Sequence, residues 1–478
     1  MTQPFLPQIA SPALQSLRFT VYYGTIAHTP ELGRLEVLYN TAVGVDKAGQ
    51  IAFIQPETVD PVQAATSYDS SLSAENIDVV DISGSENQFF FPGFIDTHIH
   101  APQFPNCGIF GNATLLDWLE TYTFPLESSF KDLDIAADIY AKVVERTLAN
   151  GTTAASYYAT IHPLATNLLA DMAMMKGQRA LIGKCCMNQN SPQHYIETLE
   201  ECQKSTNQVL EHIHRRDAKG LLIKPIITPR FAGSCTEDLL RWLGDLRSKN
   251  DYHCQTHLSE NKAEIEWTMK LFPDFKNYTD IYEKTNLLGH KTILAHCVHL
   301  TDEERDVIAS HGSGISHCPT SNSSITSGEA RIRWLLESGV NVSLGTDCSG
   351  GFTPSILSVA RQAHLVSRHL VMKTEVEAEK LSSNDVLYLA TMGGAKALDM
   401  ADSLGSFAVG KKWECQMIDL ACEGSPVDTF KYQEPRWESS ERAEAEHRFQ
   451  DLIDKWLFNG DDRNVRRVYV NGRCVVKK

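Results

Sequence analysis

The alternation of hydrophobic and polar residues changes its period along the chain. Up to residue 95, apolar positions often recur every second residue, which predicts strands at 17–28, 35–54, 78–84 and 88–95. Residues 55–77 are rich in Pro, Ser, Thr and Asp and are predicted to form a loop. This first part is therefore β-rich and too small to enclose a large core of its own.

The same pattern returns at the end of the chain. Residues 405–420 and 465–476 are predicted strands, and an Asn-Gly pair in the second is typical of a tight hairpin turn. We therefore predict one small β-sandwich domain built from both chain ends, residues 1–90 and 401–478. A charged stretch at about 421–460, helical towards its end, is predicted to be a surface insertion within it.

Between these ends, residues 91–400 alternate short apolar runs with helical periods. The segment 134–151 is one such amphipathic helix, closed by a glycine. A first strand is predicted at 94–98, and seven more apolar runs follow it. Eight β-α units predict an α/β fold of the (β/α)8 TIM-barrel type, with its active site at the carboxyl ends of the strands. The seven later runs are 152–159, 180–186, 220–229, 252–259, 292–298, 314–319 and 340–347.

Composition narrows the class of protein. The formal net charge is -16, which argues against a partner that is a nucleic acid or an anionic membrane surface. No run approaches the roughly 18 apolar residues of a membrane helix, and residues 1–10 lack the features of a signal peptide. The 12 cysteines include no C-x-x-C pair, as expected of reduced thiols in a cytoplasmic enzyme.

Two histidines near the end of the first barrel strand suggest a metal site. Side chains two apart on a strand share a face, so His98 and His100 would both point to the strand's end. The spacing alone is weak evidence, because His212 and His214 repeat it within a predicted helix. Positions two apart on a helix diverge by about 200°, so that second pair is predicted to lie on the surface.

Four further residues occur at or just after the ends of predicted barrel strands. They are His257, Glu260, His296 and Asp347. Each alone has a structural explanation, as a hydrogen-bonded loop residue or a helix cap. Together with the histidine pair they predict a metal-dependent active site. Three imidazoles and one carboxylate suit Zn2+, which activates bound water at neutral pH, and Glu260 is placed to move protons.

The remaining histidines of the barrel strands fit this site less well. His253 lies about 13 Å deeper than His257 along the same predicted strand face, because a strand rises about 3.3 Å per residue. His290 and His299 flank a strand outside its inward phase, and His317 is assigned no more than an indirect role.

At these residues the chain resembles the amidohydrolase superfamily of metal-dependent hydrolases. The motifs PGFIDTHIH, HLSE, LAH and GTD occur in that order, on a predicted barrel with a composite β-domain. Longer stretches resemble the guanine deaminases within that superfamily. Among them are LLDWLETYTFPLE at 115–127, KPIITPRF at 224–231 and KNYTDIYEKTNLL at 276–288.

The resemblance implies a hydrolase that converts guanine and water to xanthine and ammonia in purine catabolism. It implies one Zn2+ per chain, with iron as the other choice, and a homodimer. Glu260, His296 and Asp347 would act in catalysis, and Gln103, Arg230 and Phe231 would hold the purine beside the metal ligands. The implied metal ligands are His98, His100, His257 and Asp347, of which the last three would also contact substrate.

The chemistry of Arg230 agrees with that substrate. Its guanidinium offers only donors, so it can pair with the carbonyl at C6 of guanine but not with the amine of adenine. We expect adenine to leave a buried charge unpaired. Phe231 would supply an aromatic face, although a core position is equally compatible with its sequence context. Trp118 and Tyr122 are predicted to pack in the core.

Three other functions stay open at this point. A cyclic-amide hydrolase of the same superfamily would hold two metals bridged by a modified lysine, and Lys224 lies on the fourth predicted strand. A related aminohydrolase could act on a triazine, pterin, cytosine or adenosine-type ring. A non-catalytic assembly protein could retain the barrel. The other zinc deaminase design needs P-C-x-x-C, which this chain lacks.

Overall fold

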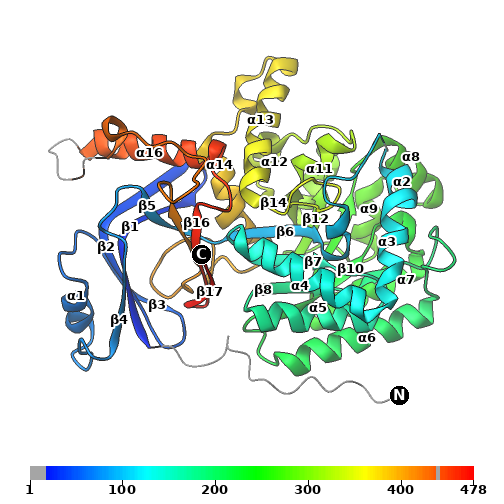
Figure 1. Ribbon diagram of the computed structural model, residues 1–478. Coiled ribbons are helices and arrows are strands. Elements are labelled where there is room, and N and C mark those ends of the chain that lie inside the picture. The colour runs from blue at the N-terminus through cyan, green and yellow to red at the C-terminus, as the bar shows by residue number, and fades with distance from the viewer. Residues whose placement is uncertain (1–17, 113, 436, 438–441) are drawn as a thin grey trace.

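A computed structural model describes residues 18–112, 114–435, 437 and 442–478. Residues 1–17, with the predicted absence of a signal peptide and the start of the predicted β-domain, lie outside it. In Figure 1 a β-rich part joins a closed barrel surrounded by helices, with β6 running from one to the other. Within the described residues no helix is both long and apolar enough to cross a membrane.

The barrel has the eight parallel strands that the sequence predicts, arranged in chain order around the axis. The third is interrupted after β8, and the short β9 continues it beside β10. The strands are β6 (Phe94–His100), β7 (Thr152–Tyr158), β8 (Arg179–Gly183) with β9 (Cys185–Cys186), β10 (Ile223–Pro229), β11 (His253–Leu258), β12 (Thr292–His296), β13 (Gly314–His317) and β14 (Asn341–Leu344).

The barrel closes where its first and last strands meet. The Thr97 hydroxyl lies 2.7 Å from the Ser343 hydroxyl and donates to the Leu344 carbonyl at 2.9 Å. The amide of Asp347 donates to the His98 carbonyl at 2.8 Å. This closure brings the end of β14 against the end of β6, so residues some 250 positions apart share one site.

Helices cover the outside of the barrel, and several begin at side-chain caps. Thr198 forms a reciprocal capping box with Glu201, and Thr301 does the same with Glu304. The helices are α2 (Leu115–Trp118), α3 (Phe124–Ser128), α4 (Leu133–Ala149), α5 (Pro163–Lys176), α6 (Leu199–Arg216), α7 (Glu237–Asn250), α8 (Lys262–Leu271), α9 (Tyr278–Lys284), α10 (Asp302–Ser310), α11 (Pro319–Ser324), α12 (Ile332–Glu337), α13 (Ile356–Thr374), α14 (Ser383–Tyr388) and α15 (Gly394–Ala397).

Both chain ends contribute to a separate eight-stranded sheet, as predicted. Strand β5 pairs in parallel with β1 and antiparallel with β15, which joins the N-terminal and C-terminal strands. The strands are β1 (Phe19–Glu31), β2 (Arg34–Val45), β3 (Ile51–Gln55), β4 (Ile77–Asp81), β5 (Gln88–Pro92), β15 (Cys415–Asp419), β16 (Val465–Val470) and β17 (Arg473–Lys477).

The predicted loop at 55–77 is wrong over α1 (Pro61–Tyr68). Asp60 accepts from the amides of Val62 and Gln63, and Pro61 occupies the first helical position, where its missing N–H costs no hydrogen bond. The same Pro and Asp that suggested a loop therefore start a helix.

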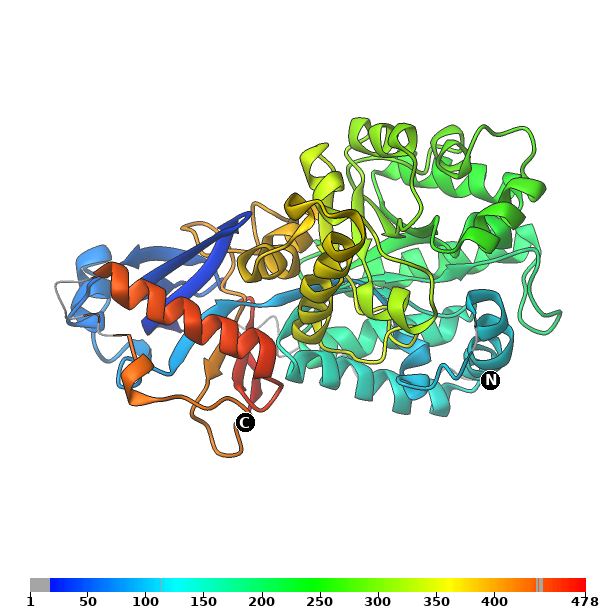
Figure 2. The same ribbon diagram turned by 90° about the horizontal axis from the view of Figure 1, so that it is seen from above.

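Helix α16 (Arg442–Asn459) corresponds to the helix predicted towards the end of the stretch 421–460. Its Trp456 ring lies 5.6 Å from the ring of Phe89 and 5.1 Å from that of Phe91, both on β5. Figure 2 shows the helix running along the β-domain towards the barrel. Its apolar face therefore covers part of the sheet.

The β-domain contacts the barrel at the amino ends of its strands. Arg179, the first residue of β8, donates to Glu414 through Nη2 at 2.6 Å and Nε at 3.0 Å, and both side chains are buried. Gln416 of β15 donates to the Pro92 carbonyl just before β6. This contact leaves the carboxyl ends of the barrel strands clear.

Candidate active site

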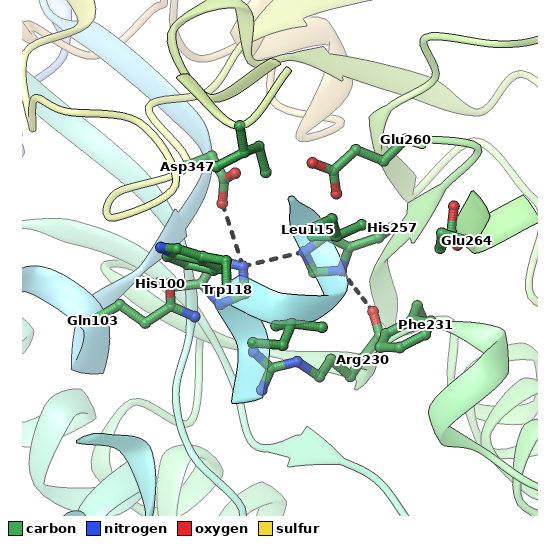
Figure 3. A pocket seen from close by; sticks show the side chains of 12 residues that line it. His100, Gln103, Leu115, Trp118, Arg230, Phe231, His257, Glu260, Glu264 and Asp347 are labelled. Carbon is green, nitrogen blue, oxygen red and sulfur yellow. Dashed lines mark hydrogen bonds and ion pairs between the residues drawn. The ribbon is translucent and has the colours of Figure 1, made fainter. Parts of the chain in front are cut away.

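Four predicted metal ligands meet at the carboxyl ends of the barrel strands. One ligand atom from each of His98, His100, His257 and Asp347 lies within 4.8 Å of all the others. The Nε2 of His98 is 3.1 Å from Asp347 Oδ1, and the Nε2 atoms of His100 and His257 are 3.1 Å apart. Figure 3 shows His100, His257 and Asp347 converging on one point.

The electrostatics of this cluster fit a metal cation. Burial lowers the pKa of all three histidines, so their imidazoles are neutral. Burial raises the pKa of Asp347, but the electrostatic influence of the adjacent His98 ring, its hydrogen bond to the carboxylate and the nearby His296 lower that pKa far below its ordinary range. Neutral imidazole nitrogens that converge beside a carboxylate form a donor set suited to a metal cation.

Hydrogen bonds at Nδ1 hold His257 and His296 in suitable tautomers. His257 Nδ1 donates to the Arg230 carbonyl at 2.6 Å, which leaves the Nε2 lone pair free for the cluster. His296 Nδ1 donates to Asn322 Oδ1 at 2.9 Å. Its Nε2 then faces Glu260 Oε2 at 3.4 Å and Asp347 Oδ2 at 3.7 Å.

A second grouping, of His98, His296 and Cys318, is less suited to a metal. Metal binding by cysteine requires the thiolate. Burial raises the pKa of Cys318 well above its ordinary value, and its thiol donates to the Ser316 carbonyl at 3.5 Å. Cys318 is therefore a neutral thiol.

Glu260 lies beside the cluster, as its spacing from His257 predicts. Its Oε1 accepts from the Ser327 hydroxyl at 3.0 Å, and its Oε2 faces His296. Burial raises the pKa of Glu260, while the charge of His296 lowers it. Glu260 is hydrogen-bonded at one oxygen, lies near His296 at the other and lines the cavity, so it is placed to exchange protons with a ligand there.

A small cavity opens in front of the cluster. Its lining combines apolar and aromatic side chains with a few polar groups, as in small-molecule sites. Metal-cluster residues form one wall and the predicted purine-binding residues another (Figure 3). The lining residues are His100, Gln103, Leu115, Trp118, Leu119, Arg230, Phe231, His257, Glu260, Glu264, Ile325 and Asp347.

Arg230 does not carry an isolated charge, which corrects one premise of the sequence analysis. Its Nη1 and Nη2 donate to the two carboxylate oxygens of Glu127 at 2.6 and 3.1 Å. Gln103 Nε2 donates to the same carboxylate at 2.7 Å. Glu127 is fully buried, so the argument that adenine would leave Arg230 without any charged partner is wrong.

Glu127 was not singled out by sequence reasoning. It stands in α3 and also accepts from the Tyr195 hydroxyl at 2.8 Å. The signal was present, since Glu127 is the last residue of the stretch 115–127 that carries the resemblance to guanine deaminases. This carboxylate accepts hydrogen bonds from three residues, Arg230, Gln103 and Tyr195, and so fixes the positions of Arg230 and Gln103.

Trp118 has a larger part in the site than the prediction of core packing implies. It is 4% exposed and packs in an apolar cluster with Phe124 and Tyr195, but it also lines the cavity. Tyr122 packs against the same cluster and is not among the lining residues. Phe231, 7% exposed, both packs in this cluster and lines the cavity.

The residues that sequence reasoning set aside lie elsewhere. His253 Nε2 pairs with the Leu398 carbonyl at 2.9 Å, and His212 and His214 stand on α6 outside the barrel. Lys224 interacts with the charges of Arg179 and Lys291, at the amino ends of the strands, and takes no part in the metal cluster.

Glu264 is the second carboxyl that sequence reasoning missed. It stands in the first turn of α8, is 3% exposed and lines the cavity. Burial raises its pKa to about 7, against the effect of the nearby Tyr278 hydroxyl, and the charge of Glu260 adds to the rise.

Comparisons with known proteins agree with this geometry. Residues 89–475 match the model of the amidohydrolase family. The chain is 47% identical to a probable guanine deaminase of Schizosaccharomyces pombe, over 95% of this chain and 83% of that protein. It is 38% identical to the guanine deaminase of Homo sapiens, over 95% and 96%. The structure of the guanine deaminase from C. acetobutylicum with bound guanine superposes with a TM-score of 0.83, at 29% identity over 96% of this chain and 100% of that one. A barrel with this His, His, His and Asp cluster, matched over most of its length, places the chain in the amidohydrolase family.

Proposed function

We propose that this protein is a guanine deaminase, which hydrolyses guanine to xanthine and ammonia in purine catabolism. The observation that carries the proposal is the cavity in which a metal-ligand cluster and Glu260 face Arg230 and Gln103. The similarity to guanine deaminases over 95% of the chain supports the same substrate. The reaction class is hydrolysis of a C–N bond in a cyclic amidine.

The metal that we propose is one Zn2+ per chain, held by His98, His100, His257 and Asp347. Three neutral imidazoles and one carboxylate are a donor set that suits Zn2+, and iron is the other metal compatible with it. When bound, the metal supplies Lewis-acid activation of water at neutral pH.

The protein's own groups then position the reactants and move protons. His296, fixed by Asn322, and Asp347 orient the attacking water towards C2 of guanine. Glu260 takes a proton from that water and delivers it to the ring nitrogen beside C2. It then takes the second proton from the added hydroxyl and passes it to the amine, which leaves as ammonia while the C2 carbonyl forms. Its single hydrogen bond to Ser327 leaves one carboxylate oxygen available for this exchange.

Recognition of guanine rests on the Arg230 and Glu127 pair. The bidentate contact leaves other N–H groups of Arg230 free to donate to the C6 carbonyl. Adenine presents an amine there, so two donors would face each other in the cavity. Discrimination therefore comes from mismatched donors, with Phe231 and Trp118 enclosing the ring.

We further propose a cytoplasmic homodimer, with the chemistry in residues 91–400 and a flanking domain formed by 1–90 and 401–478. All twelve cysteines lie within the described residues and are free, which supports a reducing compartment. Analytical ultracentrifugation tests the dimer.

One assay tests the function directly. Purified protein is incubated with guanine, adenine and cytosine, and ammonia release is followed with and without a chelator. We expect release from guanine alone and its loss with chelator. Release from another ring instead would support a related aminohydrolase. Absence of release would support an assembly protein. A metal analysis that finds two tightly bound metals per chain would support a cyclic-amide hydrolase.

A further inference from the structure

Glu264 is a buried carboxyl in the substrate cavity with no hydrogen-bond partner among the described residues. Both of its oxygens are buried and accept no hydrogen bond. The Tyr278 hydroxyl and the Asn261 amide lie close enough to lower the pKa of the carboxyl as donors would, but neither reaches hydrogen-bond geometry. A buried carboxylate left in this state is costly, so a donor from a ligand is the expected partner.

The position of Glu264 indicates which part of a ligand it meets. Figure 3 shows Glu260 and Glu264 on one side of the cavity, with Arg230 and Gln103 across from them. Glu264 follows Glu260 by four residues, at the start of α8, and the two carboxyls are close enough to interact electrostatically. Glu260 Oε2 lies 3.4 Å from His296 Nε2, beside the cluster.

The covalent structure of guanine matches this arrangement. From C2, one direction around the ring leads through N1 to the C6 carbonyl, and the other leads through N3 and C4 to N9–H. With the C6 carbonyl at Arg230 and C2 at the cluster, the N3 edge faces Glu260. The next donor along that edge is N9–H.

We propose that Glu264 is a specificity-determining residue that accepts a hydrogen bond from N9–H of the purine. This rests on the proposed function. The contact selects the free base. A nucleoside carries a sugar at N9, so it lacks the N–H donor, and the sugar would occupy the place of the Glu264 carboxyl. Glu264 thus complements Arg230, with one group recognising the C6 carbonyl and the other the unsubstituted imidazole ring.

The test compares guanine with 9-methylguanine, in which a methyl group replaces the N9 hydrogen and so removes the donor and adds little bulk. We expect wild-type protein to prefer guanine strongly, and Glu264→Ala to lower its kcat/KM for guanine about 10- to 100-fold. The same variant should leave kcat/KM for 9-methylguanine unchanged or raised, so the preference falls by at least about tenfold. Glu264→Gln keeps an acceptor oxygen and should retain more of the preference.

Controls separate this role from a structural one. Glu266→Ala changes an exposed acid on the same helix and should leave both substrates unaffected. Metal content and melting temperature of each variant show that the site is intact. An equal loss for both substrates, in both Glu264 variants, would overturn the proposed contact while guanine deamination by the wild type stands. Absence of guanine deamination by the wild type would overturn the proposed function itself.

Discussion

Glu127 binds Arg230 through both carboxylate oxygens, at 2.6 and 3.1 Å, although the two residues are 103 positions apart. The pair is buried, and the same carboxylate holds Gln103 at 2.7 Å. The polar wall that faces the substrate is therefore electrically neutral, with its donors aimed by an acid that does not itself line the cavity.

Glu127→Gln should lower kcat/KM for guanine about 100-fold, because it leaves the buried Arg230 charge without its partner. It should also strengthen inhibition by xanthine, which loses a ring proton near neutral pH and would meet an uncompensated positive charge. Steady-state kinetics with added xanthine, at two pH values, measure both effects.

Glu237→Gln provides a matched control for that variant, since Glu237 pairs with Arg241 on the exposed face of α7. Neither constant should change in the control. A Glu127→Gln enzyme with weaker guanine binding but unchanged xanthine inhibition would argue that Glu127 only supports the fold.

Metal binding should depend on strand context rather than on the H-x-H spacing. His100→Ala removes one of four converging ligands and should lose most of the bound metal and all measurable deamination. His214→Ala alters the exposed member of the helical H-x-H copy and should keep both. Elemental analysis after dialysis against chelator gives the comparison.

Removal of metal should also destabilise the wild type, because ligand binding to the folded state adds to its stability. The melting temperature should fall on chelation and recover when Zn2+ is restored. An unchanged melting temperature, with metal demonstrably absent, would contradict a buried cluster that needs a cation.

Glu260→Gln should keep the metal and lose turnover by about 1,000-fold, because the amide cannot carry protons between water and the ring. The expected result is a low kcat with little change in the binding of xanthine. Ser327→Ala removes only the hydrogen bond to Oε1 and should have a much smaller effect. Loss of metal from Glu260→Gln would mean that Glu260 is a ligand.

The grouping of the four proposed metal ligands could be predicted because local patterns carried the information. Each of them ends or follows a barrel strand, and the topology of parallel barrels brings all such ends to one rim. Period-two alternation identified His98 with His100, and the helical period dismissed His212 with His214.

The recognition wall could not be predicted in the same way. Glu127 reaches Arg230 and Gln103 from α3, and no local periodicity encodes where that segment lies over the barrel. Glu264 sits on an amphipathic helix, where an acid two positions away is exposed. In both cases tertiary packing decides which acid is buried. The helix α1 was missed for a simpler reason, since Asp and Pro serve both turns and helix starts.

The junction between the barrel and the β-domain should depend on the Arg179 and Glu414 pair. Glu414→Ala leaves a buried guanidinium without its carboxylate and should cost about 3–5 kcal/mol of unfolding free energy. Glu237→Ala breaks an exposed pair and should cost about 1 kcal/mol or less. Denaturant unfolding measures both, and kcat at low temperature should be unaffected because the junction lies at the far end of the strands.

Glu264 should make the protein less stable as the pH rises. Its pKa is about 7 in the folded state against an ordinary value of 4.5, so the folded state holds a proton that the unfolded state releases between those values. Stability is therefore lost as the pH rises from about 4.5 to about 7, by about 3 kcal/mol from this group.

Glu264→Gln does not titrate, so its unfolding free energy relative to wild type should rise across that range. Glu266→Gln should run parallel to wild type. Parallel curves for Glu264→Gln as well would mean that the carboxyl is not protonated in the folded protein at neutral pH, whereas a divergent curve together with lost guanine selectivity would show that this acid trades stability for recognition of the substrate.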